Sequence, residues 1–366
     1  MILISSIIGL IYSFLIGSFY YGFEKKTCLK LKNQHPENSF SILIAFRNEE
    51  TNLPELLDSL KNLNYPTNRF EIIFIDDHSE DNSVKIIESF LAQNSSIKIQ
   101  IVANKKTGKK AAISLGIKSA TFDWILTTDA DCKVPRLWLC TFDSLMQEKD
   151  YLFIAGPVAF NATRSFLHEF QDIDFLSLQG STIGSFSLGK PFMCNAANSG
   201  FHKETFLKLH GFYGNENIAS GDDVFLLEKM NQQHPTKIGF LNTKEAIVET
   251  KPQNNWKELI HQRMRWAAKA TAYNNYFGIL IGIIVFSSNI LLGILAVLNI
   301  EYAVCFFICK TILDYLLIRK TAEFFSKKID LISYLSTSLL YPIFSVFIFL
   351  STLVFKFEWK GRLMKK

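Results

Sequence analysis

The sequence predicts an α/β domain flanked by membrane-spanning helices, one before it and about three after it. From residue 39 to residue 131, short apolar runs alternate with helical patterns four times, which is typical of a parallel sheet wound with helices on both faces. Longer apolar runs lie outside this region, at Ile2 to Tyr21 and at about 277–299, 301–318 and 331–355. Charged residues follow the ends of the predicted strands, which is where open α/β sheets bind ligands.

The N-terminal run is long enough to span a bilayer, because it holds about twenty residues without a charge. No basic segment precedes it and no convincing cleavage site follows, so residues 1–23 are expected to form an uncleaved anchor rather than a signal peptide. The positive-inside rule places the lysines after it in the cytoplasm. These are Lys25, Lys26, Lys30 and Lys32. We therefore expect an integral protein of the cell (inner or plasma) membrane with a cytoplasmic domain.

Composition argues against an ordinary soluble protein and gives no reason to expect nucleic acid as a partner. The hydrophobic fraction is 48%, with 33 phenylalanines among 366 residues. The net charge of +5 comes with lysines and arginines gathered beside the apolar runs, where they would meet anionic lipid head groups. The six cysteines show no spacing typical of a metal site or a disulfide framework.

The chain divides into five predicted segments. Mixed charge and sufficient length for one globular domain indicate a cytoplasmic α/β domain at 35–253, after the anchor. An interfacial amphipathic helix is predicted at 254–273, a membrane region at 276–356 and a basic tail at 357–366.

Polar residues recur where the strands of the domain end. The strands are predicted at 39–46, 70–75, 97–102 and 124–126, and the residues after them are, in order, Arg47 and Glu49, Asp76 and Asp77, Lys109, and Asp129 and Asp131. Each group by itself is ordinary turn chemistry or solvated surface. Four such groups in succession would line one edge of the sheet and form a crevice able to hold a nucleotide and its diphosphate.

Asp129 and Asp131 directly follow the apolar strand Trp124 to Leu126. Side chains two residues apart in an extended segment point the same way, so the two carboxylates could present oxygens to one shared point. Such a point suits a hard divalent cation, which commonly binds through one or two carboxylates and substrate phosphates. A solvated turn also accommodates two aspartates, so the rest of the chain has to decide between these interpretations.

An ordered set of motifs resembles the membrane-bound family 2 glycosyltransferases. This family of inverting nucleotide-sugar enzymes includes cellulose, chitin and hyaluronan synthases and ceramide glucosyltransferase. The matching segments are Ile44 to Glu49, Ile75 to Ser79, Gly108 to Ala112, Thr128 to Asp131, Ser220 to Asp223, and Gln262 to Trp266. The resemblance covers roughly residues 38–270 and implies a GT-A fold, which is the Rossmann-like nucleotide-diphospho-sugar transferase fold.

The resemblance also implies residue roles in donor binding. The nucleoside, usually uridine, would be held by Ala45, Arg47, Glu49, Asp76, Asp77 and Lys109. Asp129 and Asp131 would bind the diphosphate through Mg²⁺ or Mn²⁺, which neutralises charge on the leaving group. Met193 to Phe201 resembles the small-residue segment under the donor sugar, where backbone and sugar approach closely.

Asp222 and Asp223 resemble the acidic pair in which the second residue is the general base. Asp223 would take the proton of the acceptor hydroxyl, which becomes acidic as its bond to the anomeric carbon forms. A helix is predicted to begin at Asp222, because Val224 to Met230 is apolar at helical spacing. The alternative is therefore that both acids merely favour a helix N-terminus.

The last matching segment is the QxxRW motif, which we define as Gln262, Arg265 and Trp266. The resemblance implies that Arg265 faces the diphosphate and Trp266 the acceptor. The motif lies on an amphipathic stretch, so an interfacial helix with snorkelling arginines is the alternative, and both descriptions can hold together.

The C-terminal apolar runs leave two features open. Lys310 and Asp314 are four residues apart, a spacing that allows a structural ion pair on one helix face, with a role in an acceptor path as the alternative. Three full spans would put the basic tail outside, against the positive-inside rule. We therefore expect an inside tail and one re-entrant segment, with Pro342 as a kink in the last run.

The predicted function is metal-dependent transfer of a single sugar from a UDP-hexose to a membrane lipid. Candidate acceptors are a ceramide-like lipid, diacylglycerol, a carotenoid or a polyprenyl carrier. One alternative is a processive polysaccharide synthase with a glycan acceptor, which the QxxRW motif favours and the small number of spans disfavours. Another is a non-catalytic subunit that binds sugar nucleotide or lipid, against which the intact carboxylates argue.

Overall fold

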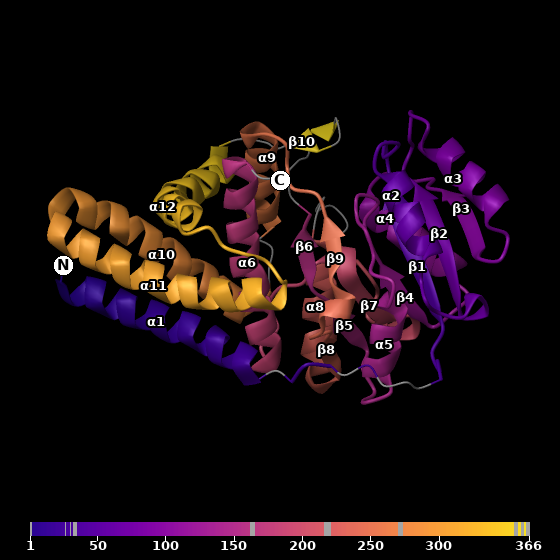
Figure 1. Ribbon diagram of the computed structural model, residues 1–366, viewed down its shortest axis with the longest axis horizontal. Helices are drawn as coiled ribbons and strands as arrows, with labels where there is room; N and C mark the ends of the chain where they lie inside the picture. The colour runs from indigo at the N-terminus through magenta and orange to yellow at the C-terminus, as the bar shows by residue number, and fades with distance from the viewer. Residues whose placement is uncertain are drawn as a thin grey trace. The chain divides into compact units, whose positions relative to one another are not determined.

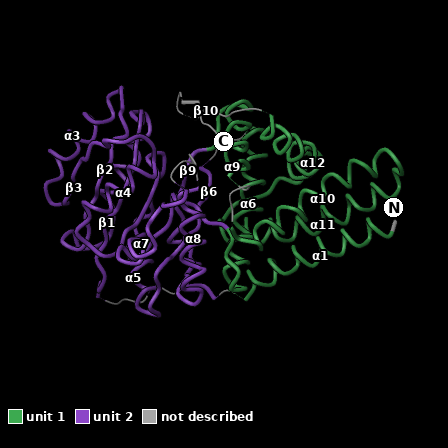
Figure 2. The backbone as a smooth tube through the Cα atoms, turned by 180° about the vertical axis from the view of Figure 1, so that it is seen from behind, with its two compact units in different colours: residues 1–26, 162–192, 252–366 green, residues 27–161, 193–251 purple. Residues whose placement is uncertain are grey.

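The computed structural model describes residues 2–25, 27–29, 31, 35–161, 165–215, 221–269, 274–354, 358–359 and 362–363. These residues form two compact units, each built from segments distant in sequence (Figure 2). The α/β unit consists of residues 27–161 and 193–251, and the helical unit of residues 1–26, 162–192 and 252–366. Residues 162–192 thus interrupt the α/β unit and belong to the helical one.

The α/β unit contains a mixed sheet of seven strands within its described residues, in the order β3-β2-β1-β4-β7-β5-β8 (Figure 1). Its strands are β1 (Phe40–Phe46), β2 (Phe70–Asp76), β3 (Lys98–Ala103), β4 (Trp124–Thr127), β5 (Phe153–Ala155), β7 (Ser199–His202) and β8 (Ile238–Phe240). Strands β1 to β4 are parallel, and β7 runs antiparallel to both of its neighbours. A smaller parallel pair joins β6 (Val158–Phe160) and β9 (Val248–Thr250).

Helices follow the first strands as the sequence predicts. The helices of this unit are α2 (Leu53–Lys61), α3 (Ser83–Gln93), α4 (Lys109–Ser119), α5 (Trp138–Met146), α7 (Lys203–Lys208) and α8 (Asp222–Gln233). The predicted strand–helix alternation is confirmed. Because β1 to β4 are parallel neighbours, their carboxyl ends meet at one edge of the sheet, and the polar residues after them share that edge.

The sheet also buries a carboxylate at its other edge. Glu71 on β2 is 1% exposed and accepts hydrogen bonds from Ser41 Oγ (2.7 Å) and from the backbone nitrogen of Thr121 (2.5 Å). Its Oε2 lies 2.6 Å from Lys98 Nζ. Burial alone raises the pKa of Glu71, but these partners together hold it below its usual value.

We expect Glu71→Gln to destabilise the protein by about 1.5–3 kcal/mol at pH 7, the range for hydrogen bonds to a charged group. A lowered pKa in the folded protein means that the charged form stabilises it above the unfolded pKa, and that this contribution is lost as pH falls. Thermal unfolding of wild type and Glu71→Gln in detergent, at pH 7 and at pH 4, measures how this contribution to stability depends on pH. The difference between variant and wild type should shrink at pH 4, and a difference that grows would contradict the assignment.

The helical unit consists of long helices. They are α1 (Ile2–Lys25), α6 (Phe166–Ser187), α9 (Trp256–Ala268), α10 (Tyr276–Leu298), α11 (Ile300–Phe324) and α12 (Leu331–Val354). Within the described part of the chain, α1, α10 and α12 are long and apolar enough to cross a membrane. About three C-terminal membrane helices were expected, and two meet this description. Helix α11 does not, because Glu301, Lys310, Asp314 and Arg319 are spread along it.

Helix α12 is one continuous helix with Pro342 inside it, and the expected re-entrant segment stays a prediction. Proline is tolerated inside membrane helices when neighbouring groups and hydroxyl side chains compensate for its missing donor. Pro342 cannot donate a backbone hydrogen bond to the carbonyl of Ser338, four residues before it. Most of the predicted basic tail at 357–366 lies outside the described residues. Three of the four lysines expected on the cytoplasmic side after the anchor, Lys26, Lys30 and Lys32, also lie outside them.

Glycines allow α6 to approach its neighbours at backbone distance. A Cβ on Gly184 would come within 3.0 Å of the backbone of Phe19 on α1, and one on Gly22 within 3.0 Å of the Gly184 carbonyl oxygen. A Cβ on Gly180 would equally collide with Thr321 on α11. Small residues four apart are the usual means of close helix packing in membranes.

We expect Gly184→Leu to destabilise the helical unit by about 3 kcal/mol or more, since the colliding atoms are backbone and cannot rotate away. Gly17→Leu on α1 is the matched control, because a Cβ there meets no described atom within 4 Å. Thermal unfolding of both variants in one detergent measures the difference. Equal stabilities would show that α1 and α6 do not pack through these glycines.

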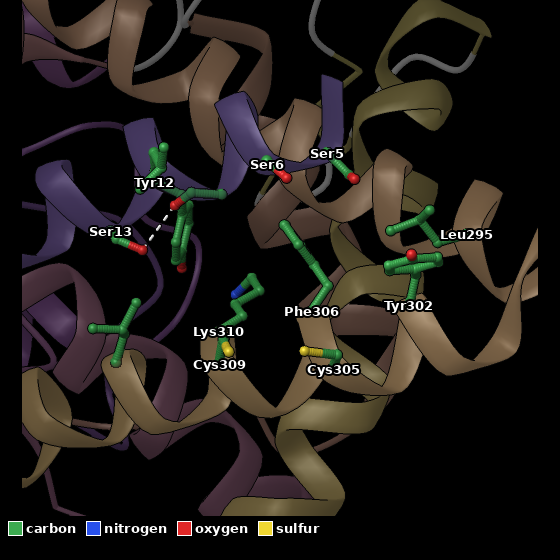
Figure 3. A pocket seen from close by; sticks show the side chains of 13 residues that line it. Ser5, Ser6, Tyr12, Ser13, Leu295, Tyr302, Cys305, Phe306, Cys309 and Lys310 are labelled. Carbon is green, nitrogen blue, oxygen red and sulfur yellow. Dashed lines mark hydrogen bonds between the residues drawn. The ribbon is translucent and has the colours of Figure 1, made fainter. Parts of the chain in front are cut away.

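A cavity of about 390 Å³ lies between α1, α10 and α11 (Figure 3). Tyr12 and Lys310 lie towards one end of it, and Leu295 and Tyr302 towards the other. Lys310 Nζ donates a hydrogen bond to Asp314 at 2.6 Å, and the Tyr12 hydroxyl donates to the same carboxylate at 2.5 Å. The predicted structural pair of Lys310 and Asp314 is therefore confirmed.

Candidate active site

The loops after β1 and β2 are tied together by buried side chains. Asp77 is 4% exposed and accepts hydrogen bonds from Asn104 Nδ2 (2.8 Å) and from the Gly108 backbone nitrogen (2.9 Å). The backbone of Glu49 donates to Ser83 Oγ at 2.8 Å, and its carboxylate accepts from Asn52. These contacts fix the conformation of the loops at the strand ends, where Asp77 and Glu49 were predicted to hold the nucleoside.

The other predicted nucleoside residues lie at the same strand ends. Ala45 is half-buried near the end of β1. Arg47 lies just after this strand and forms an ion pair with Glu80, with 3.2 Å between Arg47 Nη2 and Glu80 Oε1. Asp76 ends β2 and accepts a hydrogen bond from the backbone of Ser79 at 2.9 Å. All of them lie beyond or at the carboxyl ends of parallel neighbours. Their role in binding a nucleoside remains a prediction.

Lys109 joins two acidic groups that are distant in sequence. It begins α4 after Gly108, whose φ of 101° lies in a region that favours glycine. Its Nζ lies 2.6 Å from Asp129 Oδ1 and 3.4 Å from Asp222 Oδ2. Burial alone lowers the pKa of Lys109, but the neighbouring carboxylates of Asp129 and Asp222 raise it above its usual value. The side chain is therefore a fixed cation within the acidic site rather than solvated surface.

Asp129, Asp131 and Cys132 form a group whose ligand atoms all lie within 4.8 Å of one another. The two half-exposed carboxylates are hard oxygen donors of the kind that Mg²⁺ and Mn²⁺ take. Cys132 is buried, and burial together with the adjacent Asp131 raises the pKa of its thiol, so it stays protonated. The donor set therefore fits a hard divalent ion held by the carboxylates, with phosphate oxygens to complete its shell.

Asp223 lies in the first turn of α8 and contacts the segment that precedes β7. Its Oδ2 accepts a hydrogen bond from the Ala196 backbone nitrogen at 3.2 Å. Gly221 before the helix has φ 83°, so the turn favours glycine as predicted, while Ser220 lies outside the described residues. Helix α8 begins at Asp222 as expected, and its acids also contact neighbouring groups of the site.

One small residue of the segment under the predicted sugar site has a packing reason. A Cβ on Gly200 would come within 3.0 Å of Leu126 on β4 and of Phe142 on α5. The packing of Leu126 and Phe142 against this position therefore leaves room for glycine but not for a larger residue. The motif residues Ala196 and Ala197 lie just before β7, where Asn195 accepts a hydrogen bond from the Ala197 nitrogen at 3.0 Å.

The QxxRW motif lies on α9 of the helical unit, whereas the carboxylates belong to the α/β unit. Gln262, Arg265 and Trp266 are half-buried there. That Arg265 faces the diphosphate and Trp266 the acceptor remains a prediction.

Sequence reasoning missed two features of the structure near the predicted residues. It did not single out Cys132, although this residue directly follows Asp131. It also missed Asp174 on α6 and its ion pair with Arg263, for which the sequence offers no local signal because 89 positions separate the two.

Comparison with known proteins identifies a shared domain. Residues 41–209 match the family described as Glycosyl transferase family 2. The poly-beta-1,6-N-acetyl-D-glucosamine synthase of Staphylococcus epidermidis is 26% identical over 263 residues, which cover 69% of this chain and 61% of that protein. The undecaprenyl-phosphate 4-deoxy-4-formamido-L-arabinose transferase of Pseudomonas fluorescens is 36% identical over 105 residues, 28% of this chain and 30% of that protein.

A solved structure shares the fold over nearly the whole chain. The mannosyltransferase PcManGT of Pyrobaculum calidifontis, in complex with GDP-Man and Mn²⁺, aligns with a TM-score of 0.60 at 12% identity. The alignment covers 96% of this chain and 98% of that one. The chain spans about three fifths of the length of the synthase that it matches, so the comparison with that relative is partial.

Proposed function

We propose that this chain, a glycosyltransferase family 2 member through its domain at residues 41–209, transfers one sugar from a UDP-hexose to the hydroxyl of a membrane lipid. The transfer would invert the anomeric carbon. The observation that carries this proposal is the convergence of Asp129, Asp131, Asp222 and Lys109 at the carboxyl edge of the sheet. A diphosphate requires cations, which Lys109 and an ion held by Asp129 and Asp131 would supply. An acceptor hydroxyl requires a base, and Asp223 directly follows Asp222 of this cluster.

The donor would bind along the edge formed by the ends of β1, β2 and β4. Glu49, Asp77 and Arg47 would meet the nucleoside, and the Lys109 ammonium would meet a diphosphate oxygen. Mg²⁺ or Mn²⁺ held by Asp129 and Asp131 would supply charge neutralisation at the leaving diphosphate. The solved mannosyltransferase that shares the fold holds Mn²⁺ and GDP-Man, which supports a nucleotide-sugar and a divalent ion here.

Asp223 would remove the proton of the acceptor hydroxyl as the new bond to the anomeric carbon forms. The backbone nitrogens of Ala196 and Val224 donate hydrogen bonds to its two carboxylate oxygens, at 3.2 Å and 2.8 Å, and so hold the carboxylate in a fixed orientation. The preceding residue, Asp222, lies 3.4 Å from Lys109 Nζ, so the proposed base directly follows a carboxylate of the acidic site.

A lipid acceptor is supported by the membrane helices and by one relative. Helices α1, α10 and α12 are long and apolar enough to cross a membrane, so a domain attached to them would work at a lipid surface, which we place on the cytoplasmic side. The Pseudomonas fluorescens relative is named for transfer to undecaprenyl phosphate, itself a membrane lipid.

A processive polysaccharide synthase is the second candidate function. The poly-beta-1,6-N-acetyl-D-glucosamine synthase matches 69% of this chain, which is a longer match than that to the lipid-linked transferase. A glycan acceptor would then replace the lipid, while the donor side of the site would stay the same.

One assay distinguishes these functions. Membranes that contain the protein are incubated with labelled UDP-sugars, a lipid extract and Mn²⁺ or Mg²⁺, with GDP-mannose as an added donor. We expect label in the organic phase, where mass spectrometry identifies the acceptor. Label in an insoluble polymer would establish the synthase instead. A protein that binds donors but transfers none, under any of these conditions, would be a binding subunit.

A further inference from the structure

We infer that Asp174 is a positioning residue for the QxxRW motif, acting through Arg263. This inference rests on the proposed function, because it assigns the motif a place in the reaction. Asp174 lies on α6 and Arg263 on α9, both within the helical unit. Both side chains are buried, with 4% and 8% of their surface exposed.

Asp174 fixes the direction of the Arg263 guanidinium. Arg263 Nε donates a hydrogen bond to Asp174 Oδ2 at 2.8 Å, and Nη2 lies 2.8 Å from the same oxygen. The guanidinium is a rigid, planar fork, so two contacts on one side determine where its remaining donors and its flat faces point.

The fixed guanidinium contacts two of the three motif side chains. Nη1 of Arg263 donates a hydrogen bond to Gln262 Oε1. The plane of the guanidinium lies over Trp266, with its central carbon 4.2 Å from the ring centroid, in a cation–π arrangement. One arginine thus orients the amide of Gln262 and the indole of Trp266 at the same time.

Stability alone does not require this ion pair. An apolar cluster already holds α9 against α6 and α12, with the buried residues Phe170, Leu259, Met264, Phe344 and Ile348. Desolvation makes a buried ion pair a poor source of stability, and well-packed apolar side chains often replace it without loss. What apolar side chains cannot supply is a directed donor for Gln262.

The test compares four variants in the full-length protein, using the donor and acceptor turned over by wild type. We expect Asp174→Asn and Arg263→Lys each to lower kcat about tenfold to hundredfold. A displacement of the reacting groups by about 1 Å can lower the rate of a reaction about hundredfold. The nucleotide-sugar dissociation constant should stay unchanged. Asp172→Asn is the matched control, since this neighbouring α6 carboxylate pairs with Lys327 instead.

The fourth variant separates positioning from stability. The double change Asp174→Leu with Arg263→Met replaces the buried pair by apolar side chains and should unfold at or above the wild-type temperature. We expect its kcat to stay as low as that of Asp174→Asn. A double variant with restored kcat, or an Asp174→Asn protein with wild-type kcat, would overturn the inference.

A second measurement does not depend on activity. The chain has five tryptophans, so 5-fluorotryptophan labelling gives a resolvable ¹⁹F spectrum in which Trp266→Phe identifies one signal. We expect the Trp266 signal to shift in Asp174→Asn and in the double variant, and not in Asp172→Asn. If wild type transfers no sugar, the proposed function fails on its own, while an unmoved Trp266 signal would overturn the positioning role.

Discussion

Replacing Asp223 by asparagine is expected to lower the rate of sugar transfer about 10³-fold, within the range typical of a lost general base. Asparagine has nearly the same shape and its carbonyl oxygen can still accept the hydrogen bond from the Ala196 nitrogen, so the segment before β7 should stay in place. The amide cannot take up the proton of the acceptor hydroxyl. Initial rates with saturating donor and acceptor measure the loss, and the dissociation constant of the donor should remain that of wild type.

The control for this prediction removes the same charge from an exposed position of the same unit. Asp58 lies on the solvent face of α2, and Asp58→Asn should leave the rate unchanged. A rate for Asp223→Asn equal to that of this control would show that another group takes the proton. A weaker donor affinity together with a lower rate would instead indicate that Asp223 helps to bind the nucleotide-sugar.

Asp131→Asn is expected to lower transfer about 10²–10³-fold, because a metal ion at the leaving group contributes several kcal/mol to the transition state. The amide oxygen is a weaker ligand than a carboxylate, so the Mn²⁺ or Mg²⁺ concentration for half-maximal activity should rise as well. Activity is measured against metal concentration after treatment with a chelator. Chelation should abolish the wild-type activity, and either ion should restore it.

Cys132→Ser tests whether the neighbouring thiol is a ligand. A thiol sulfur is a soft donor, whereas Mg²⁺ and Mn²⁺ prefer the hard oxygens of carboxylates and phosphates. We therefore expect unchanged metal dependence in Cys132→Ser and strongly changed dependence in Asp131→Asn. The opposite result, with Cys132→Ser the more impaired variant, would assign the ion to a softer site.

Both predictions concern carboxylates close in sequence to the two that contact Lys109. Asp129 and Asp222 each lie within 3.4 Å of Lys109 Nζ, although the first lies in the loop after β4 and the second begins α8. Like charges at such distances repel, and an interposed ammonium offsets that repulsion. Lys109 thereby allows the acid after β4 and the acid that begins α8 to lie close together.

The sequence by itself determined the elements and the candidate residues of the α/β unit. Strands β1 to β4 and the helices between them follow from local apolar periodicity, which is fixed by residues a few positions apart. The motif residues were found through the resemblance to a known family, which can be recognised because each motif occupies only a few consecutive positions. Their meeting at one edge followed from the parallel order of consecutive strands, which short connections favour.

Only the tertiary structure decided which distant residues touch. No local pattern pairs Asp174 with Arg263, joins Lys109 to Asp222, or shows that Gly184 lies against α1. It also decided that residues 162–192 leave the α/β unit, that β7 runs antiparallel between β4 and β5, and that α12 continues through Pro342. These features depend on the path of the whole chain and on the packing of surfaces that meet only after folding. The periodicity of residues within one segment does not determine either of them.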